Sequence, residues 1–242
     1  MVSTAWAFTT MTSERRLSNV QRDELINKYP VLYHMAEEGT WPSIQKRGLL
    51  STQALVDLYN PEPAVKNSIL GAVRRSSIAL DNPVLGRTII RDQRPLKFLD
   101  KCLLPGTSPQ QFLDVLNGRV FFWLARHRLE TLLSARLYRD KQQTVLHVDT
   151  GRLMERYGDE VELAPYNTGS MHIPNAPRRG KDVFVAVDDY PYDDWRVQRG
   201  SKGDAVVELT VPYAVPDISD MTLRVESWSG GDVVDVIYSA PD

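Results

Sequence analysis

The stretch that most constrains the fold is residues 31–50, VLYHMAEEGTWPSIQKRGLL. It begins with five residues that are apolar or aromatic apart from one histidine, His34. A short run of this composition, bounded by turn residues, is typical of a buried strand. The stretch therefore places an imidazole inside a hydrophobic element, where it is either a core histidine or part of a binding site.

The rest of this stretch carries the signals of a short helix. Thr40 is a residue type that caps helix N-termini, and Pro42 fits the first turn because that turn needs no amide donor from it. Gly48 follows the last helical residue, and a glycine can close the last turn in a left-handed conformation. A strand followed by a capped helix over 41–47 indicates a chain that mixes both element types.

Patterns along the remainder support an α+β fold. Apolar residues at helical spacing predict helices over 21–28, 51–59, 63–75, 95–103, 108–116, 126–139 and 150–157. Apolar and β-branched runs predict strands over 76–80, 85–90, 119–124, 144–148, 161–163, 183–187, 205–211, 221–225 and 233–239. Because no repeat or linker interrupts this series, we expect one domain over residues 20–242 after a flexible tail, residues 1–19.

The bulk composition is that of a globular protein, with 42% hydrophobic and 25% charged residues. The formal net charge of −2 gives no sign of a nucleic-acid partner, although it leaves room for a local basic groove. Cys102 is the single cysteine, and its apolar neighbours predict a buried thiol in a reducing compartment.

No apolar run reaches the roughly 20 residues that cross a bilayer, and the N-terminus lacks the basic start of a secretory signal. We therefore expect a cytoplasmic protein with no membrane partner.

The segment 164–179, APYNTGSMHIPNAPRR, is irregular and rich in turn-forming residues. Loops of this length inside a compact domain are usually functional or mobile. Within it, Asn167 and Ser170 have two interpretations. They are common turn formers, and they also carry amide and hydroxyl groups that a ligand can bind.

Three other residues stand out because their chemistry does not match their surroundings. Glu208 interrupts the strand pattern of AVVELTV, so its carboxylate must face solvent, a partner or a ligand. Arg91 precedes Asp92 and is either half of an ion pair or a phosphate clamp. Tyr138, near the end of the predicted helix over 126–139, is either core or part of a site.

Several common catalytic signatures are missing from the sequence. There is no GxGxxG motif, no phosphate-binding GxxxxGK[ST] loop, no HExxH motif, no cysteine pair and no GxSxG motif. A classical dinucleotide fold and a zinc hydrolase are therefore disfavoured, and the sequence predicts no metal site.

Taken in order, the motifs resemble those of the ADP-ribosyltransferase superfamily, and in particular the DarT-type nucleic-acid ADP-ribosyltransferases and a related bacterial family. Tyr33-His34 and the helix that ends in RGLL resemble the opening motif of that superfamily. There the histidine holds the NAD ribose and an adjacent amide, so the resemblance assigns NAD binding to Tyr33 and His34. The next residue here is Met35, where the superfamily usually has Thr or Gly-Thr.

Two further passages carry the resemblance. RVFFWLARHRLETLLSARLY resembles the aromatic strand that lines the nicotinamide pocket and the helix that ends in tyrosine, which assigns NAD binding to Phe122, Trp123 and Tyr138. AVVELTV followed by a V-P-x-x-I segment resembles the strand of the catalytic glutamate, which assigns that role to Glu208. Arg91 corresponds by position to an arginine of the DarT-type enzymes, and the resemblance makes it a second catalytic residue.

The resemblance implies an ADP-ribosyltransferase-like fold with two packed mixed or antiparallel sheets flanked by helices. It also implies an NAD-dependent mono-ADP-ribosyltransferase that modifies a macromolecule, with a nucleobase favoured over a protein side chain. Asn167, Ser170, Arg178 and Arg179 would then belong to an acceptor-facing loop. Such an enzyme would suit a toxin or a phage-defence effector, which leaves room for an antitoxin partner.

Two alternatives remain at this point. An NAD glycohydrolase would use the same residues but transfer the sugar to water. A catalytically silent module would keep the fold and bind NAD or nucleic acid without turnover.

Overall fold

The structure is a computed structural model that describes residues 21–200 and 203–241. The predicted flexible tail, residues 1–19, lies outside the described residues. Residues 21–28 are helical, as predicted. Among the described residues, none of the helices combines the length and the apolar character needed to cross a bilayer.

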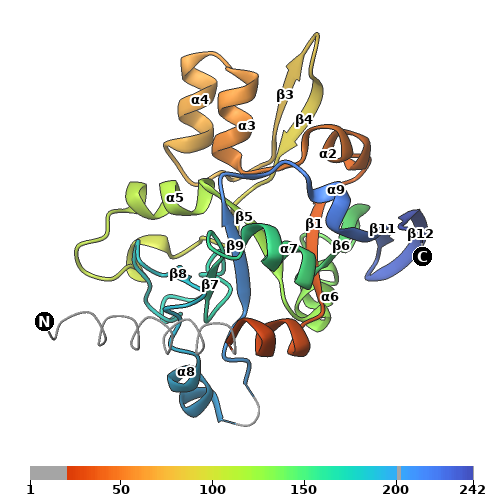
Figure 1. Cartoon of the computed structure of the whole chain (residues 1–242). Helices are drawn as coiled ribbons and strands as arrows, with labels where there is room; N and C mark the ends of the chain where they lie inside the picture. The colour runs from red at the N-terminus through yellow and green to blue at the C-terminus, as the bar shows by residue number, and fades with distance from the viewer. Residues whose placement is uncertain (1–20, 201–202, 242) are drawn as a thin grey trace, which may run out of the picture.

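The fold is α+β and is built on one eight-stranded sheet in which every neighbouring pair of strands is antiparallel (Figure 1). In spatial order the strands are β12 (Asp232–Ser239), β11 (Thr222–Ser229), β6 (Gln143–Asp149), β1 (Val31–Glu37), β5 (Arg119–Trp123), β9 (Glu208–Pro212), β7 (Glu162–Ala164) and β8 (Val185–Ala186). The expectation of two packed sheets is corrected here, because the two halves join edge to edge through β1 and β5.

Two small two-stranded sheets accompany the large one. β3 (Ile78–Asn82) and β4 (Gly86–Ile90) form a hairpin, and β2 (Leu49–Leu50) pairs with β10 (Ala214–Val215). Gly48, just before β2, has a φ of 82°, and a Cβ on it would lie 2.3 Å from the Cα of Pro216. The glycine predicted as a helix stop is therefore also required by this close approach of two backbones.

The helices are α2 (Trp41–Arg47), α3 (Thr52–Tyr59), α4 (Pro63–Leu70), α5 (Pro109–Asn117), α6 (Arg126–Leu133), α7 (Thr150–Tyr157), α8 (Tyr192–Arg199) and α9 (Ile218–Met221), with a 3-10 turn η1 (Leu99–Lys101). α5 begins with a capping box made by Ser108 and Gln111. Thr40 occupies the N-cap position of α2, but its hydroxyl donates to the Glu37 carbonyl, so the predicted side-chain cap does not form.

The two faces of the sheet are packed differently. On one face, side chains from β1, β5, β6 and β9 form a single hydrophobic cluster with α2, α7 and α9, which includes Leu32 and Phe122. On the other face there are two separate clusters. One gathers around α6 and includes Met35 and Trp228, and the other gathers around α5 and includes Phe112. α3, α4 and the β3–β4 hairpin have a cluster of their own at the end of the sheet (Figure 1, top).

Several predicted elements differ from the observed ones. The helix predicted over 95–103 is a series of turns with only η1 inside it. The helix predicted over 126–139 ends at Leu133, so Tyr138 lies in the turns that follow. The strand predicted over 205–211 begins at Glu208. α8 was not predicted.

Candidate functional site

A cavity opens where β1 and β5 separate. The two strands share a single paired position, Tyr33 with Trp123, whereas β1 pairs with β6 along its whole length. At the next position a side-chain hydrogen bond replaces the backbone pairing: His34 Nδ1 lies 2.8 Å from the Phe121 carbonyl oxygen. Beyond this point the strands diverge, and a cavity of about 540 Å³ lies between them. Its volume is within the range of small-molecule sites.

Residues from both halves of the sheet, from α2, α3 and the β3–β4 hairpin, and from the 164–179 segment line this cavity. Its basic lining residues are Arg47, Arg74, Arg87, Arg91 and Arg119, and its acidic ones are Glu37, Glu38, Asp92 and Glu208. The apolar and aromatic lining includes Phe121, Trp123, Leu55 and Tyr59. The combination of aromatic rings and guanidinium groups suits a ligand with flat rings and negative charge.

Glu208 begins β9 opposite Trp123 and is only 4% exposed. Its Oε2 accepts two hydrogen bonds from Thr168, one from the backbone amide at 3.0 Å and one from the hydroxyl at 2.6 Å. Oε1 has no hydrogen-bond partner among the described residues. Burial raises the pKa of the Glu208 carboxyl to about 7, although the hydrogen bonds from Thr168 act in the opposite direction. The side chain is therefore held by one oxygen, while the residue lines the cavity.

His34 lies on β1 at the edge of the same cavity. A carbonyl oxygen only accepts hydrogen bonds, so the bond to Phe121 requires the proton on Nδ1 and leaves Nε2 as an acceptor. Loss of solvent around the ring lowers the pKa of His34 to about 4, and the positive charge of Arg91 also lowers it. The imidazole is therefore neutral at pH 7 and can accept a hydrogen bond from a ligand hydroxyl.

Arg91 follows β4 and meets Tyr138 across the cavity wall. Its guanidinium carbon lies 5.1 Å from the centre of the tyrosine ring. Its Nε lies 3.7 Å from Glu37 Oε1, and its Nη1 donates to the Met35 carbonyl at 3.3 Å. The ion pair that the sequence suggested with Asp92 is not the one the structure contains, because the closest carboxylate partner is Glu37. Both Arg91 and Tyr138 line the cavity, as the site prediction requires.

Arg74 is a site residue that the sequence did not reveal. It is 6% exposed and donates to the carbonyls of Arg91 and Ile69 and to Asn117 Oδ1 at 2.8, 2.8 and 2.9 Å. Among the described residues no carboxylate lies within ion-pair distance of it, and burial lowers its pKa to about 10. A buried cation without a paired anion is costly. Asp92 acts on Arg74 only from beyond ion-pair distance, so Arg74 adds positive charge to the wall that also carries Arg91.

The 164–179 segment closes the cavity on the side of Glu208. Asn167 and Ser170 line the cavity, together with His172. Arg179 is 2% exposed, and its Nη1 donates to the carbonyls of Asn167 and Thr168 at 2.6 and 2.9 Å. Its guanidinium therefore holds the loop in place and is too buried to contact a macromolecular acceptor. Arg178 is exposed but lies outside the cavity lining.

Two predicted NAD-binding residues lie outside the cavity lining. Tyr33 belongs to the cluster around α6, and its ring meets that of His147 edge-on at 5.1 Å. Phe122 is 1% exposed and packs into the continuous core on the opposite face. The neighbouring rings of Phe121 and Trp123 line the cavity instead. Strand alternation explains the difference, because successive side chains of β5 point to opposite faces.

Comparison with known proteins places the chain in a family. No curated protein matches it. Residues 30–222 match a family of unknown function, DUF7002, and every residue that lines the cavity lies within this range. The match covers well over half of the 242 residues. The chain therefore belongs to the DUF7002 family.

Proposed function

We propose that the protein transfers ADP-ribose from NAD to a macromolecular acceptor. The observation that carries this proposal is the state of Glu208: a buried carboxylate, anchored through Oε2 by Thr168, with Oε1 unpartnered among the described residues and a cavity beside it. A structural carboxylate in a core is normally paired through both oxygens or with a cation. Glu208 forms no ion pair among the described residues, and the positive charges of Arg179 and Arg128 act on it only from a distance, which favours a chemical role.

The proposed chemistry needs one carboxylate and no metal. The bond between nicotinamide and ribose breaks, and its electron pair leaves with the pyridine nitrogen. Positive charge then develops on the ribose, and the ionised Glu208 would stabilise it across the cavity. The lone pair of an acceptor nitrogen or oxygen forms the new bond to the sugar, and Glu208 would take the proton that the acceptor loses.

The other residues of the cavity would position the substrate. Trp123 and Phe121 offer flat apolar surfaces for the nicotinamide ring. Arg91 and Arg74 would attract the diphosphate, since guanidinium groups bind phosphate oxygens well. His34 Nε2 would accept a hydrogen bond from a ribose hydroxyl.

The raised pKa of Glu208 gives the proposal a pH signature. A protonated carboxyl carries no charge with which to stabilise the sugar cation and cannot take a proton. The value of about 7 therefore predicts that kcat/KM for NAD rises with pH and levels off above about pH 8.

Two products distinguish transfer from hydrolysis. Purified protein would be incubated with labelled NAD and, separately, with DNA, RNA and cell lysate. Glu208→Gln keeps the size and the acceptor oxygen for Thr168 and is expected to lower nicotinamide release by at least about 100-fold. Glu155→Gln, on the exposed side of α7, removes the same charge and is the matched control.

The outcomes separate the candidate functions. Label on a macromolecule that disappears with Glu208→Gln supports the transferase, and the labelled fraction identifies the acceptor. Free ADP-ribose without labelled macromolecule would instead support an NAD glycohydrolase. NAD left intact in every mixture would refute both enzyme activities. A toxin or defence role, and any antitoxin, depend on the first outcome.

A further inference from the structure

Two irregular segments, residues 94–104 and 171–181, lie side by side next to the Glu208 end of the cavity. Backbone hydrogen bonds hold them together: the Phe98 amide donates to the Met171 carbonyl at 3.1 Å, and the Leu104 amide to the Arg179 carbonyl at 3.0 Å. The reciprocal bonds run from Met171 to Pro95 at 2.9 Å and from Arg179 to Cys102 at 3.0 Å. We call the surface of these two segments the basic platform.

The basic platform concentrates positive charge. Its exposed basic residues are Arg94, Lys97, Lys101, Arg178 and Lys181. Asp100 is its one acidic residue. Within the described part of the chain, no carboxylate lies within 4 Å of the charged nitrogens of these five cations, whereas many other arginines are paired with one. Because the whole chain carries a net charge of −2, this is a local feature and not a consequence of composition.

Apolar and aromatic groups lie among these cations. Lys97 and Lys101 both stand over the ring of Phe98, at 5.2 and 5.8 Å from its centre. Leu104 and Ile173 are 45% and 55% exposed. Cations interleaved with exposed apolar surface are typical of proteins that bind single-stranded nucleic acid, since phosphates meet the cations and bases pack on the apolar groups.

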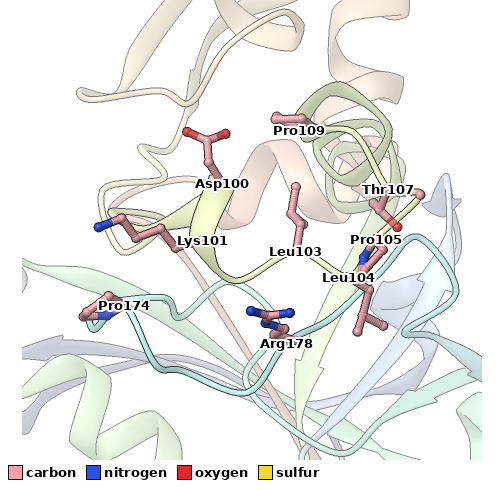
Figure 2. Close-up of a pocket in the computed structure, with 10 residues that line it drawn as sticks. Asp100, Lys101, Leu103, Leu104, Pro105, Thr107, Pro109, Pro174 and Arg178 are labelled. Carbon is pink, nitrogen blue, oxygen red and sulfur yellow. The ribbon is translucent and has the colours of Figure 1, made fainter.

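The surface between the two segments is hollowed. A pocket of about 690 Å³ lies here. Figure 2 shows Lys101 on the first segment and Arg178 on the second among its lining residues. The pocket is lined otherwise by Asp100, Leu103, Leu104, Pro105 and neighbouring residues. A hollow bordered by cations from two segments offers a path for a chain of phosphates.

The platform also leads into the proposed active site. Pro95 and Leu96, at the start of the first segment, line the cavity that contains Glu208. His172, at the start of the second, lines it too. A polymer that lies along the platform would therefore reach the cavity at its Glu208 side.

We propose that the basic platform binds the backbone of single-stranded nucleic acid and directs one nucleotide toward Glu208. The binding half of this proposal stands on the charges and contacts of the platform alone. The directing half rests on the proposed transferase function. An acidic protein is the competing partner, but it would leave the exposed apolar groups between the cations without a role.

Binding is tested with the full chain and fluorescent 12-nucleotide DNA and RNA strands, by anisotropy at 50 to 300 mM NaCl. Five phosphate contacts predict that log K falls with log salt with a slope of about −3.5, at roughly 0.7 per contact. Lys101→Glu with Arg178→Glu is expected to weaken binding at least tenfold at 50 mM salt. It should also make the slope shallower by about 1.4, because two contacts are lost.

The matched control is Lys66→Glu with Lys141→Glu, which makes the same charge change at exposed positions outside the platform. This control should bind within about twofold of wild type, because only general repulsion changes. An equal loss in both double variants would overturn the assignment of the surface. Competition by polyglutamate as strong as that by a DNA strand would overturn the choice of partner, and absence of binding at 50 mM salt would overturn the proposal outright. Circular dichroism checks that all variants are folded.

Nicotinamide release measured on the same samples separates this inference from the function it rests on. Strand binding without NAD consumption would leave the platform standing and refute the transferase. NAD consumption without strand binding would refute the platform and leave the enzyme activity standing.

Discussion

Replacing Glu208 by glutamine is expected to stabilise the protein, and the gain should grow with pH. Burial raises the pKa of the Glu208 carboxyl from its ordinary value of 4.5 to about 7. Between these two values the unfolded chain has released the proton while the folded protein retains it. The folded state therefore loses stability as the pH rises from about 4.5 to about 7. Glutamine stays neutral in both states and avoids this loss.

The magnitude follows from the two pKa values. At roughly 1.4 kcal/mol per pH unit, an interval from 4.5 to about 7 corresponds to about 3 kcal/mol in the free energy of unfolding. We expect Glu208→Gln to show this gain at pH 8 and less than about 1 kcal/mol of it at pH 5. The amide oxygen of glutamine can still accept the hydrogen bonds from Thr168.

The assay is urea unfolding followed by tryptophan fluorescence, with wild type and Glu208→Gln compared at pH 5 and pH 8. A gain at pH 8 alongside a loss of NAD turnover would show that the folded protein tolerates an unfavourable charge at this position for the sake of chemistry. Equal stability at both pH values, or a less stable variant at pH 8, would refute the reasoning. Glu208 would then be an ordinary buried residue that is well compensated in the folded state.

Two further predictions concern residues outside the chemistry. Burial alone raises the pKa of Glu226, but hydrogen bonds from Trp228 and Arg224 lower it below its ordinary value, so this carboxylate stabilises the fold above pH 4.5 and the effect is lost in acid. Glu226→Gln should accordingly cost stability at pH 7 and progressively less as the pH falls below 4.5, opposite in sign to Glu208→Gln, and urea midpoints across this pH range measure this. Arg179→Met leaves two loop carbonyls without their donor, and we expect chymotrypsin to cut the 164–179 segment at least about fivefold faster. Unchanged cleavage would mean that the loop does not depend on Arg179.

Local sequence signals were sufficient for many of the elements. The helices over 41–47 and 150–157 have the predicted bounds, because proline, cap and glycine positions lie within or next to them. The prediction of a helix over 95–103 was wrong because the apolar side chains of these residues face the 171–181 segment and their backbone forms hydrogen bonds with it. Their apolar spacing matched a helix, but contacts with a distant segment decided the conformation. α8 was missed because its N-cap is a proline and its sequence, YDDWRVQR, carries few apolar residues.

The site shows the same limit at the level of single residues. Glu208 was found because a carboxylate in a strand pattern is visible in the sequence itself. Thr168, its partner, is 40 residues away, and nothing in the turn sequence NTGS separates a ligand of Glu208 from an ordinary turn residue. The role of Arg74 could not be predicted from the sequence for the same reason, since its hydrogen-bond partners come from α4, α5 and the residue that follows β4.

The position of the cavity follows from how the sheet is packed. On one face the hydrophobic core runs without interruption from β1 to β5, and this keeps the two halves of the sheet together although they share a single paired position. On the other face the core is divided between a cluster around α5 and a cluster around α6. The cavity lining draws on both of these clusters, on that of the β3–β4 hairpin, and on Ile44, Leu49 and Val120 of the first-face cluster. At the junction the shared core cluster supplies the packing, and the His34 side chain supplies a hydrogen bond to the Phe121 carbonyl where the two strands no longer pair.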